Sequence, residues 1–245
     1  MGGSSLGVGM IGYSFMGAVH SHAWRTVGRV FDLGVDVDMR VICGRNEEAV
    51  TAAAAKYGWQ SAETDWRAVI ARDDIDIIDV CTPGSSHEEI AVAALNAGKH
   101  VICEKPLANT VAEAERMAAA AQASSGKSMV AFNYRRVPAL AYARELVRQG
   151  RLGRIFHVRA VYLQDWIIDP EFPLVWRLVK EEAGSGALGD LGAHIVDAAQ
   201  FVTGSQITNV SGELRTFIDE RPLAGETHLL EATKSAERGK VTVDD

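Results

Sequence analysis

Residues 6–17, Leu-Gly-Val-Gly-Met-Ile-Gly-Tyr-Ser-Phe-Met-Gly, are the stretch that decides the fold. A literal G-x-G-x-x-G match falls on residues 7–12, but the fingerprint needs a preceding strand, which residues 2–5 cannot supply. The match that follows the apolar run 6–11 is residues 12–17, with its first glycine for the tight turn and its last for close helix packing. We expect its backbone N–H groups to hold a pyrophosphate, with cofactor-binding residues Gly12, Tyr13, Ser14, Phe15, Met16 and Gly17. Ser14 stands where the second glycine is expected, and its Cβ narrows the approach of the phosphates. A plain strand-to-helix turn is the alternative.

Short β-rich runs alternate with helical runs from this turn through residue 132. The alternation predicts an α/β fold with a doubly wound parallel sheet of the Rossmann type. After residue 133 the order changes: helical runs at 138–149 and 188–203 and strand-like runs at 155–163 and 207–217 follow without a regular crossover. We therefore predict a Rossmann domain over residues 1–133 and an α+β domain over residues 134–245. Residues 241–243 look like the beginning of one more strand.

Composition limits the classes of function. The chain has 245 residues, 47% of them hydrophobic, and a formal net charge of −7, which fits a globular protein and argues against a nucleic-acid or anionic-membrane surface. Its three cysteines lack metal-type spacing and predict buried thiols in a reducing compartment. No apolar run reaches membrane-spanning length, and residues 1–5 lack the features of a signal peptide. We expect a cytoplasmic protein that acts on a small molecule.

Gly44 and Arg45 stand at the end of the second predicted strand, residues 39–43. An NAD site usually places Asp or Glu there to bind the ribose 2′-hydroxyl, whereas a nearby Arg suits the 2′-phosphate of NADP. This strand ends without a carboxylate, so the sequence favours NADP over NAD, with Arg45 on the phosphate or stacked on the adenine. Because an exposed Arg after a strand is common, NAD stays open.

Two further polar loops follow predicted strands at the same edge of the sheet. Open α/β sheets bind their ligands at the carboxyl ends of the strands. We therefore expect both loops to line a cofactor cleft, and the ammonium group of Lys105 to be a candidate for catalysis. The alternative is that Lys105 is a solvated turn residue before a proline. The cofactor-binding candidates in these loops are Thr82, Pro83, His87, Glu104 and Lys105.

The second predicted domain places a histidine between two carboxylates. On a helix, Asp190, His194 and Asp197 fall at i, i+4 and i+7 and share one face. A histidine in that setting is a candidate general base. Metal binding is disfavoured, because three ligands on one helix have no outside cluster of Cys or His to complete the site. A capped helix with a structural histidine remains the plain alternative.

Other histidines and tryptophans lack such company. The histidines expected to be structural are His20, His22, His100 and His157. Trp166 and Trp176 more often serve as core or interface residues than as platforms for a sugar.

In this combination and order, the motifs resemble the Gfo/Idh/MocA oxidoreductases, the family of glucose-fructose oxidoreductase and inositol dehydrogenase. The likeness covers nearly the whole chain, and the residues that carry it are the 12–17 turn with His20, Thr82-Pro83 with His87, Glu104-Lys105-Pro106, Asn133-Tyr134-Arg135, and residues 190–194 with Asp197. It implies a Rossmann domain followed by a domain with a large open, mainly antiparallel sheet. It also implies hydride transfer between NAD or NADP and a carbinol carbon of a sugar, cyclitol or related polyol. Ser14 departs from the family pattern, and so does Gly84, where Asn is common.

The resemblance implies catalytic roles for three residues. His194 would accept the hydroxyl proton as hydride leaves, Lys105 would stabilise the charge developing on the same oxygen, and Asp190 would orient the substrate or the imidazole. Lys105, Asp190 and His194 are also expected to contact the substrate. The other residues expected on the substrate side are Tyr134, Arg135, Trp166, Trp176 and Arg177.

Two other functions fit the same sequence. One is an enzyme of this fold that retains its nicotinamide and uses transient oxidation for glycoside cleavage or epimerisation. The other is a non-catalytic regulatory protein that binds NAD(P). Because relatives are longer, we expect a truncated second domain whose incomplete sheet exposes an edge, and a homo-oligomer formed through that sheet.

Overall fold

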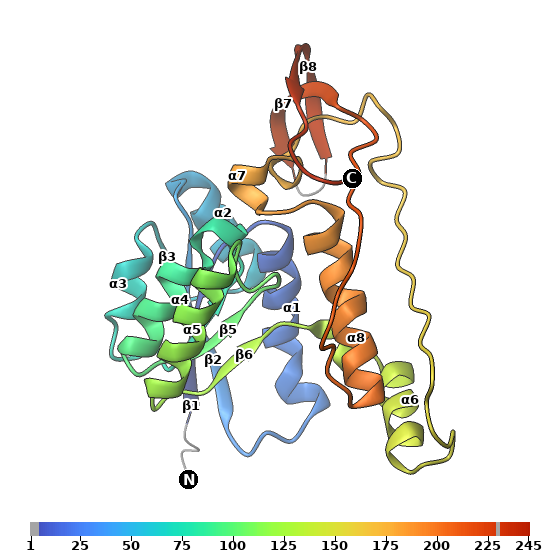
Figure 1. Ribbon diagram of the computed structural model, residues 1–245. Coiled ribbons are helices and arrows are strands. Elements are labelled where there is room, and N and C mark those ends of the chain that lie inside the picture. Colours follow the sequence, from blue (N-terminus) through green and yellow to red (C-terminus); the bar gives the residue numbers. More distant parts are fainter. Residues whose placement is uncertain (1–4, 229–230) are drawn as a thin grey trace. The chain divides into compact units, whose positions relative to one another are not determined.

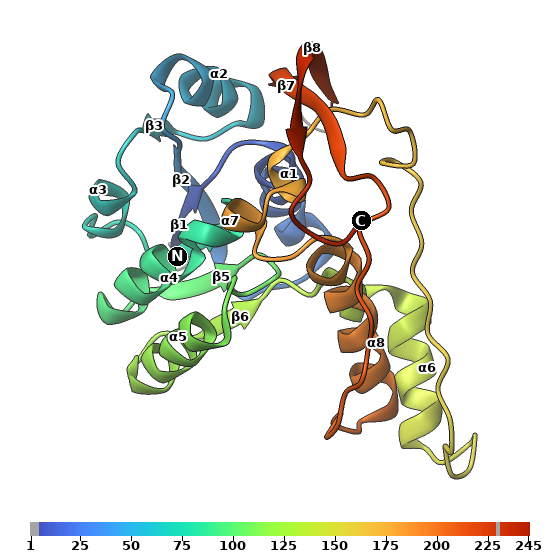
Figure 2. The ribbon, with the colours of Figure 1, turned by 45° about the horizontal axis from the view of Figure 1, so that its top comes forward.

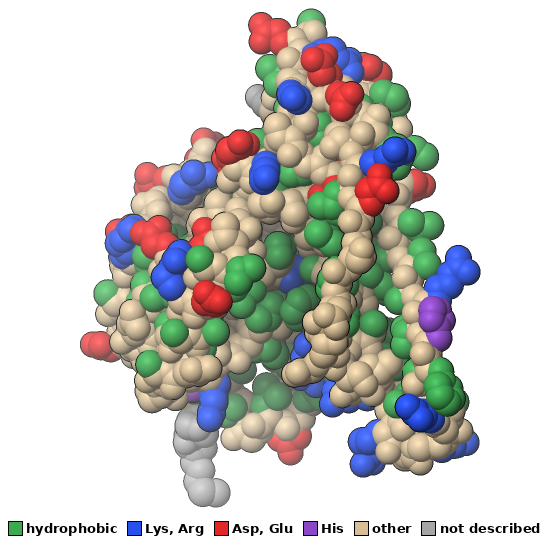
Figure 3. Space-filling model, in the orientation of Figure 1, with side chains coloured by type: hydrophobic (Ala, Val, Ile, Leu, Met, Phe, Trp, Pro, Cys, Tyr) green, Lys and Arg blue, Asp and Glu red, His purple; other side chains and the backbone are tan. Residues whose placement is uncertain are grey.

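The computed structural model describes residues 5–228 and 231–245 (Figure 1). The chain divides into two compact units, one up to Val130 and one from Ala131 onward. No helix in the described part of the chain is both long and apolar enough to pass through a bilayer. On the face shown in Figure 3, acidic and basic side chains are interspersed over the first unit.

The first unit is built on a six-stranded parallel sheet with the order β3-β2-β1-β4-β5-β6. This order reverses its direction between β1 and β4, and ligands of doubly wound sheets bind at such a switch point. The predicted Rossmann sheet is confirmed. The strands are β1 (Ser5–Ile11), β2 (Asp36–Cys43), β3 (Ser61–Glu63), β4 (Ile77–Val80), β5 (His100–Cys103) and β6 (Ser128–Val130).

Helices cover both faces of this sheet because side chains alternate along each strand. One set of strand residues packs with Val50 of α2 and with Met16 and Trp24 of α1, and the other packs with Ile90 of α4 and Met117 of α5. In both ribbon views α4 and α5 run beside each other (Figures 1 and 2). The helices are α1 (Phe15–Val30), α2 (Glu47–Tyr57), α3 (Trp66–Ile70), the 3-10 turn η1 (Gly84–Ser86), α4 (His87–Asn96) and α5 (Val111–Ala123).

The second unit combines short helices and long irregular segments with one small antiparallel sheet. Helices α6 and α8 run side by side in both views (Figures 1 and 2), and Leu178, Val241 and Val243 form a small buried cluster. The elements are η2 (Asn133–Arg136), α6 (Pro138–Arg148), η3 (Trp176–Leu178), α7 (Lys180–Ala183), the π-helical turn η4 (Leu188–Gly192), α8 (Ala193–Thr203), β7 (Glu220–His228) and β8 (Glu231–Lys240).

Three strand predictions for the second unit were wrong, because none of the three segments forms a strand. The apolar runs 155–163 and 207–217 form no strand, because no ladder partner pairs with them among the described residues. Residues 241–243 form no strand either, since Val241 and Val243 insert into the buried cluster with Leu178 instead. Conversely, β7 and β8 form from the polar stretch 219–240, which has no alternating apolar pattern to reveal it.

Candidate functional site

The glycine turn after β1 has the geometry expected for a phosphate cradle. Gly12 adopts a φ of +106°, and a Cβ there would lie 2.6 Å from the carbonyl oxygen of Cys81. A Cβ on Gly17 would lie 2.3 Å from the carbonyl oxygen of Gly12, so α1 can approach the turn only with glycine at this position. Ser14 is the N-cap of α1, its side chain makes no capping hydrogen bond, and the first turn of the helix holds no acidic residue. The backbone N–H groups in the first turn of α1, together with the helix dipole, can bind an anion such as a pyrophosphate.

Gly44 and Arg45 lie at the tip of β2. A Cβ on Gly44 would lie 2.1 Å from Cε1 of Tyr13, so the tyrosine ring occupies the space that a carboxylate side chain at residue 44 would need. Arg45 is exposed. The nearby Glu63 carboxylate accepts the N–H groups of Thr64 at 2.7 Å and Asp65 at 3.2 Å. The tip of β2 thus presents a cation and an aromatic ring.

His87 ties two loops together. Its ring nitrogens lie 2.8 Å from the carbonyl oxygen of Thr82 and 3.0 Å from that of Pro106, and the side chain is buried. Thr82 also accepts a hydrogen bond from Ser86 at 2.8 Å. His87 therefore lies between the loop that begins at Thr82 and the loop that contains Lys105, and its hydrogen bonds hold the backbones of the two loops together.

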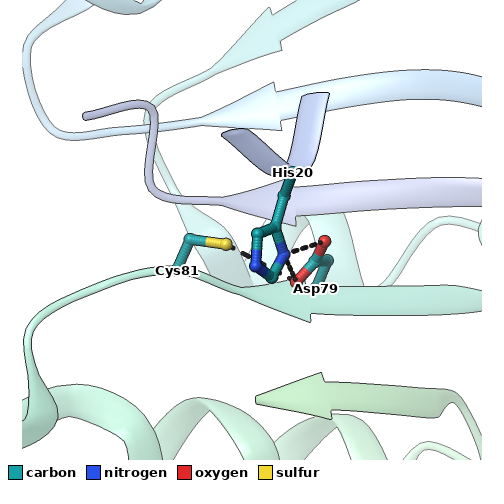
Figure 4. A group of neighbouring side chains, drawn as sticks. All are labelled: His20, Asp79 and Cys81. Carbon is teal, nitrogen blue, oxygen red and sulfur yellow. Dashed lines mark hydrogen bonds and ion pairs between the residues drawn. The ribbon is translucent and has the colours of Figure 1, made fainter. Parts of the chain in front are cut away.

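Glu104 anchors the loop that carries Lys105. One carboxylate oxygen accepts the backbone N–H of Lys105 at 3.0 Å, and the other lies 2.9 Å from Nε2 of His20. On the other side of the ring, Nδ1 of His20 lies 2.9 Å from Asp79, which also accepts the indole N–H of Trp24 at 2.7 Å. Figure 4 shows His20 reaching from α1 to Asp79 on β4. The imidazole thus links α1 and β4 to the end of β5.

His20 is positively charged in this setting. Burial alone would lower its pKa, but the hydrogen bonds and charges of Asp79 and Glu104 outweigh burial and raise the pKa to about 10. The two carboxylates are almost fully buried, with 1% and 5% exposure, and buried charges need such a partner. Sequence reasoning treated His20 as structural; the signal it overlooked is Asp79, a carboxylate inside the apolar run Ile-Ile-Asp-Val-Cys.

A metal ion is a second possible partner for this cluster, because His20, Asp79 and Cys81 each offer a ligand atom within 4.8 Å of the others. Metal ligation needs a neutral imidazole and a thiolate. Both nitrogens of His20 are instead bonded to carboxylates, and burial raises the pKa of the Cys81 thiol well above its usual value. We therefore interpret the cluster as an ion-paired support for the loop.

His194 lies in the first turn of α8 and is held by aromatic rings. Its imidazole stacks on Tyr134 at 4.3 Å between ring centroids, and it meets Phe132 and Tyr162 edge-on at 6.4 and 6.2 Å. The hydroxyl oxygens of Tyr134 and Tyr162 are 2.5 Å apart, and this hydrogen bond, followed by burial, raises the pKa of Tyr134 to about 12. Tyr134 therefore stays a neutral phenol beside His194.

Arg135 and Asp197 form an ion pair that fixes α8 to the η2 turn. The guanidinium Nε donates to both oxygens of Asp197, at 2.8 and 3.1 Å, and Nη2 donates to one of them. Arg135 also lies over the rings of Phe132 and Phe201, at 5.5 and 5.7 Å. Within this unit, then, two residues expected on the substrate side, Tyr134 and Arg135, are the ones that hold the helix of His194.

Asp190 lies near a second cation. Nε of Arg177 is 3.9 Å from the Asp190 carboxylate, and the guanidinium stacks over Trp176 at 4.5 Å. Burial lowers the pKa of Arg177 against the opposing effect of Asp190. Trp166 belongs to a different contact, an edge-to-face pair with Phe172 at 5.2 Å. The structure thus brings together three of the predicted residues, Asp190, Trp176 and Arg177.

Two family models match the chain. One is described as an oxidoreductase family with an NAD-binding Rossmann fold and matches residues 6–132; the other is the GFO/IDH/MocA C-terminal domain and matches residues 140–245.

Sugar dehydrogenases are among the similar proteins. Levoglucosan dehydrogenase of Pseudarthrobacter phenanthrenivorans is 44% identical over 98% of this chain and 63% of its own length. The crystal structure of an oxidoreductase domain protein from Kribbella flavida shares 62% identity, with a TM-score of 0.92 over 99% of this chain and 62% of that chain. A levoglucosan dehydrogenase solved in complex with NADH and levoglucosan shares 42% identity, with a TM-score of 0.91 and the same two coverages. The chain therefore spans less than two thirds of the length of these relatives.

Proposed function

This chain belongs to the GFO/IDH/MocA oxidoreductase family. We propose that it functions as a nicotinamide-dependent dehydrogenase that acts on a carbinol carbon of a sugar. The observation that carries the proposal is the loop of Lys105, which begins at the carboxyl end of β5 and is held by the buried Glu104 and His20. Burying an ion pair carries a large desolvation cost, which an ordinary surface turn does not require. A group that acts on a reacting oxygen, in contrast, must be positioned to within a fraction of an ångström.

The residues of the first unit fit a dinucleotide. Gly12 and Gly17 allow the tight turn and the close approach of α1, because a Cβ at either position would collide with a backbone oxygen, and the first turn of α1 holds no acidic residue. Ser14 narrows the approach of a phosphate but brings a hydroxyl donor. When bound, a nicotinamide supplies the hydride chemistry, so the task of the chain is to bind, orient and move a proton.

In the proposed reaction His194 takes the proton of the substrate hydroxyl on an imidazole nitrogen, and Lys105 donates a hydrogen bond to the oxygen as charge develops there. Stacking on Tyr134 fixes the plane of the imidazole without adding a charge next to it. Asp190, whose carboxylate lies 3.9 Å from Nε of Arg177, accepts a hydroxyl of the sugar in this proposal.

The substrate class comes from the relatives. Levoglucosan dehydrogenase and D-glucoside 3-dehydrogenase, the latter from Escherichia coli and 33% identical over 69% of this chain and 47% of its own length, both take their names from sugars. We propose a pyranose or anhydropyranose with a free secondary hydroxyl as the substrate of this chain.

A sugar panel tests this function. Purified protein is mixed with NAD or NADP and with levoglucosan, alkyl glucosides or inositol, and reduced nicotinamide is followed by absorbance. We expect sugar-dependent reduction that Lys105→Ala lowers by at least about 1000-fold in kcat, with His194→Ala nearly as severe, while binding of the cofactor stays largely intact. Turnover of Lys105→Ala within a few-fold of the parent contradicts the assignment. Conversion of the sugar without net reduction of nicotinamide identifies a retained-cofactor enzyme instead.

For the cofactor we propose NADP, with Arg45 on its 2′-phosphate. The support is the tip of β2, where Tyr13 fills the place of a carboxylate and Arg45 is exposed; the NADH complexes of levoglucosan dehydrogenase weigh on the other side. Calorimetric titration separates the two. We expect NADP to bind more tightly than NAD, and Arg45→Ala to weaken NADP alone by about 10- to 100-fold, because a charge-assisted contact is lost. Equal or tighter binding of NAD overturns the preference.

A further inference from the structure

Asp244 closes the start of the helix that carries Asp190 and His194. Its carboxylate accepts the backbone N–H of Gly186 at 2.9 Å and that of Leu188 at 2.6 Å. Its own carbonyl oxygen accepts the N–H of Ala187 at 3.0 Å. Asp244 therefore accepts hydrogen bonds from three consecutive backbone N–H groups, those of residues 186–188, which lie more than 50 positions away in the sequence. The first N–H groups of a helix have no partner inside it, and an anionic acceptor also suits the helix dipole.

This contact is built into the backbone on both sides. A Cβ on Gly186 would lie 1.6 Å from the carbonyl oxygen of Asp244, so the close approach requires glycine there. The segment before Asp244 is fixed as well: Thr242 accepts the N–H of Lys180 at 2.7 Å, and the carbonyl oxygen of Val243 accepts the hydroxyl of Thr216 at 2.6 Å. Asp244 is thus a rigid anchor.

The capped turn leads directly to the candidate groups. The N–H of Asp190 donates to the carbonyl oxygen of Gly186 at 2.9 Å, so the ladder of the helix begins at the residue that Asp244 holds. The next residues form the π-helical turn η4, and α8 then begins at Ala193. A π turn has one residue more per hydrogen-bonded loop than an α turn, so a shift at its start changes the direction of the side chains that follow.

We propose that Asp244 is a positioning residue, which sets where Asp190 and His194 lie by fixing the start of their helix. The proposal rests on the proposed function only in that these two side chains take part in the reaction. Nothing else in the described part of the second unit accepts the N–H groups of residues 186–188. Without the carboxylate, the first turn is left with unsatisfied donors and the π turn loses its fixed origin.

The test compares Asp244→Asn with Asp219→Asn, the same chemical change at an exposed site of the same unit. The Asn side chain keeps its size but turns an NH2 group toward one of the two donors. Backbone hydrogen exchange, followed by mass spectrometry, should become faster in residues 186–192 of Asp244→Asn and stay unchanged in β1–β5. We expect kcat to fall by about 10- to 100-fold, as for a displacement of about 1 Å, with the KM for the cofactor unchanged.

Each outcome decides the proposal. Unchanged exchange in residues 186–192, or faster exchange with an unchanged kcat, overturns it. Loss of the whole fold in Asp244→Asn also overturns it, because Asp244 would then support the entire unit rather than one turn. If the parent protein turns over no sugar, faster exchange confined to residues 186–192 still supports the anchor and the failure belongs to the proposed function.

Discussion

The loop of Lys105 and the helix of His194 are held by different forces. The loop depends on charge: an imidazolium lies between two buried carboxylates, and one of these carboxylates holds the backbone of Lys105. The position of the His194 side chain on its helix depends on ring contacts, with Tyr134 stacked on the imidazole and two further rings at its edges.

The difference suits the roles proposed for the two groups. An ammonium group that stabilises negative charge keeps one charge state, so a support that carries a net negative charge suits it. A histidine that accepts and releases a proton needs a support that is neutral in both states, and Tyr134 with its raised pKa is such a support. On this account, loss of a charged partner should cost much more than loss of a ring hydroxyl, and His20 of the first unit should make the free energy of unfolding fall between about pH 6.5 and 10.

The largest effect is expected for His20→Gln. The change removes the imidazolium that pairs with the buried carboxylates of Asp79 and Glu104, and such a loss costs about 3 to 5 kcal/mol. Chemical denaturation followed by circular dichroism measures it. The matched control is His22→Gln on the same helix, where the side chain is exposed and the expected change is below about 0.5 kcal/mol. Similar losses for both variants would show that the ion pair contributes nothing.

The same pair makes a pH dependence with a definite sign. The pKa of His20 is raised from 6.5 to about 10 on folding, so its contribution to stability is complete below about pH 6.5 and is lost as the pH rises through about 10. We expect the free energy of unfolding to fall between these values in the parent and to fall less in His20→Gln. Parallel curves for the two proteins would contradict a charged His20.

The smallest effect is expected for Tyr134→Phe. This change keeps the ring on His194 and removes only the hydrogen bond to Tyr162, which corresponds to about 1 kcal/mol in the free energy of unfolding. Tyr142→Phe on α6 is the control, since that side chain is exposed. Sugar turnover should change by less than about threefold. A loss as large as that of His20→Gln would mean that the hydroxyl, and not the ring, supports His194.

Local patterns made most of the first unit predictable. The strands and the roles of Gly12 and Gly17 follow from apolar runs and turn residues that are adjacent in sequence. The partners of His20 are 59 and 84 residues away, so no local pattern links them. In the second unit, contacts between residues far apart in the sequence explain why the strand predictions failed and why the role of Asp244 was not predicted. β7 and β8 are polar, and Asp244 meets its partners across 56 and 58 residues. Apolar alternation at 155–163 and 207–217 predicted strands, but a strand needs a ladder partner as well as a pattern.

The charge on His20 is the claim on which this comparison rests, and an NMR titration of the histidine ring signals tests it most directly. The His20 signals, assigned by their loss in His20→Gln, should keep the shifts of an imidazolium through pH 8 and titrate near pH 10. Titration of these signals near pH 6.5 would contradict the account, because a neutral imidazole could not hold two buried carboxylates at the end of β5.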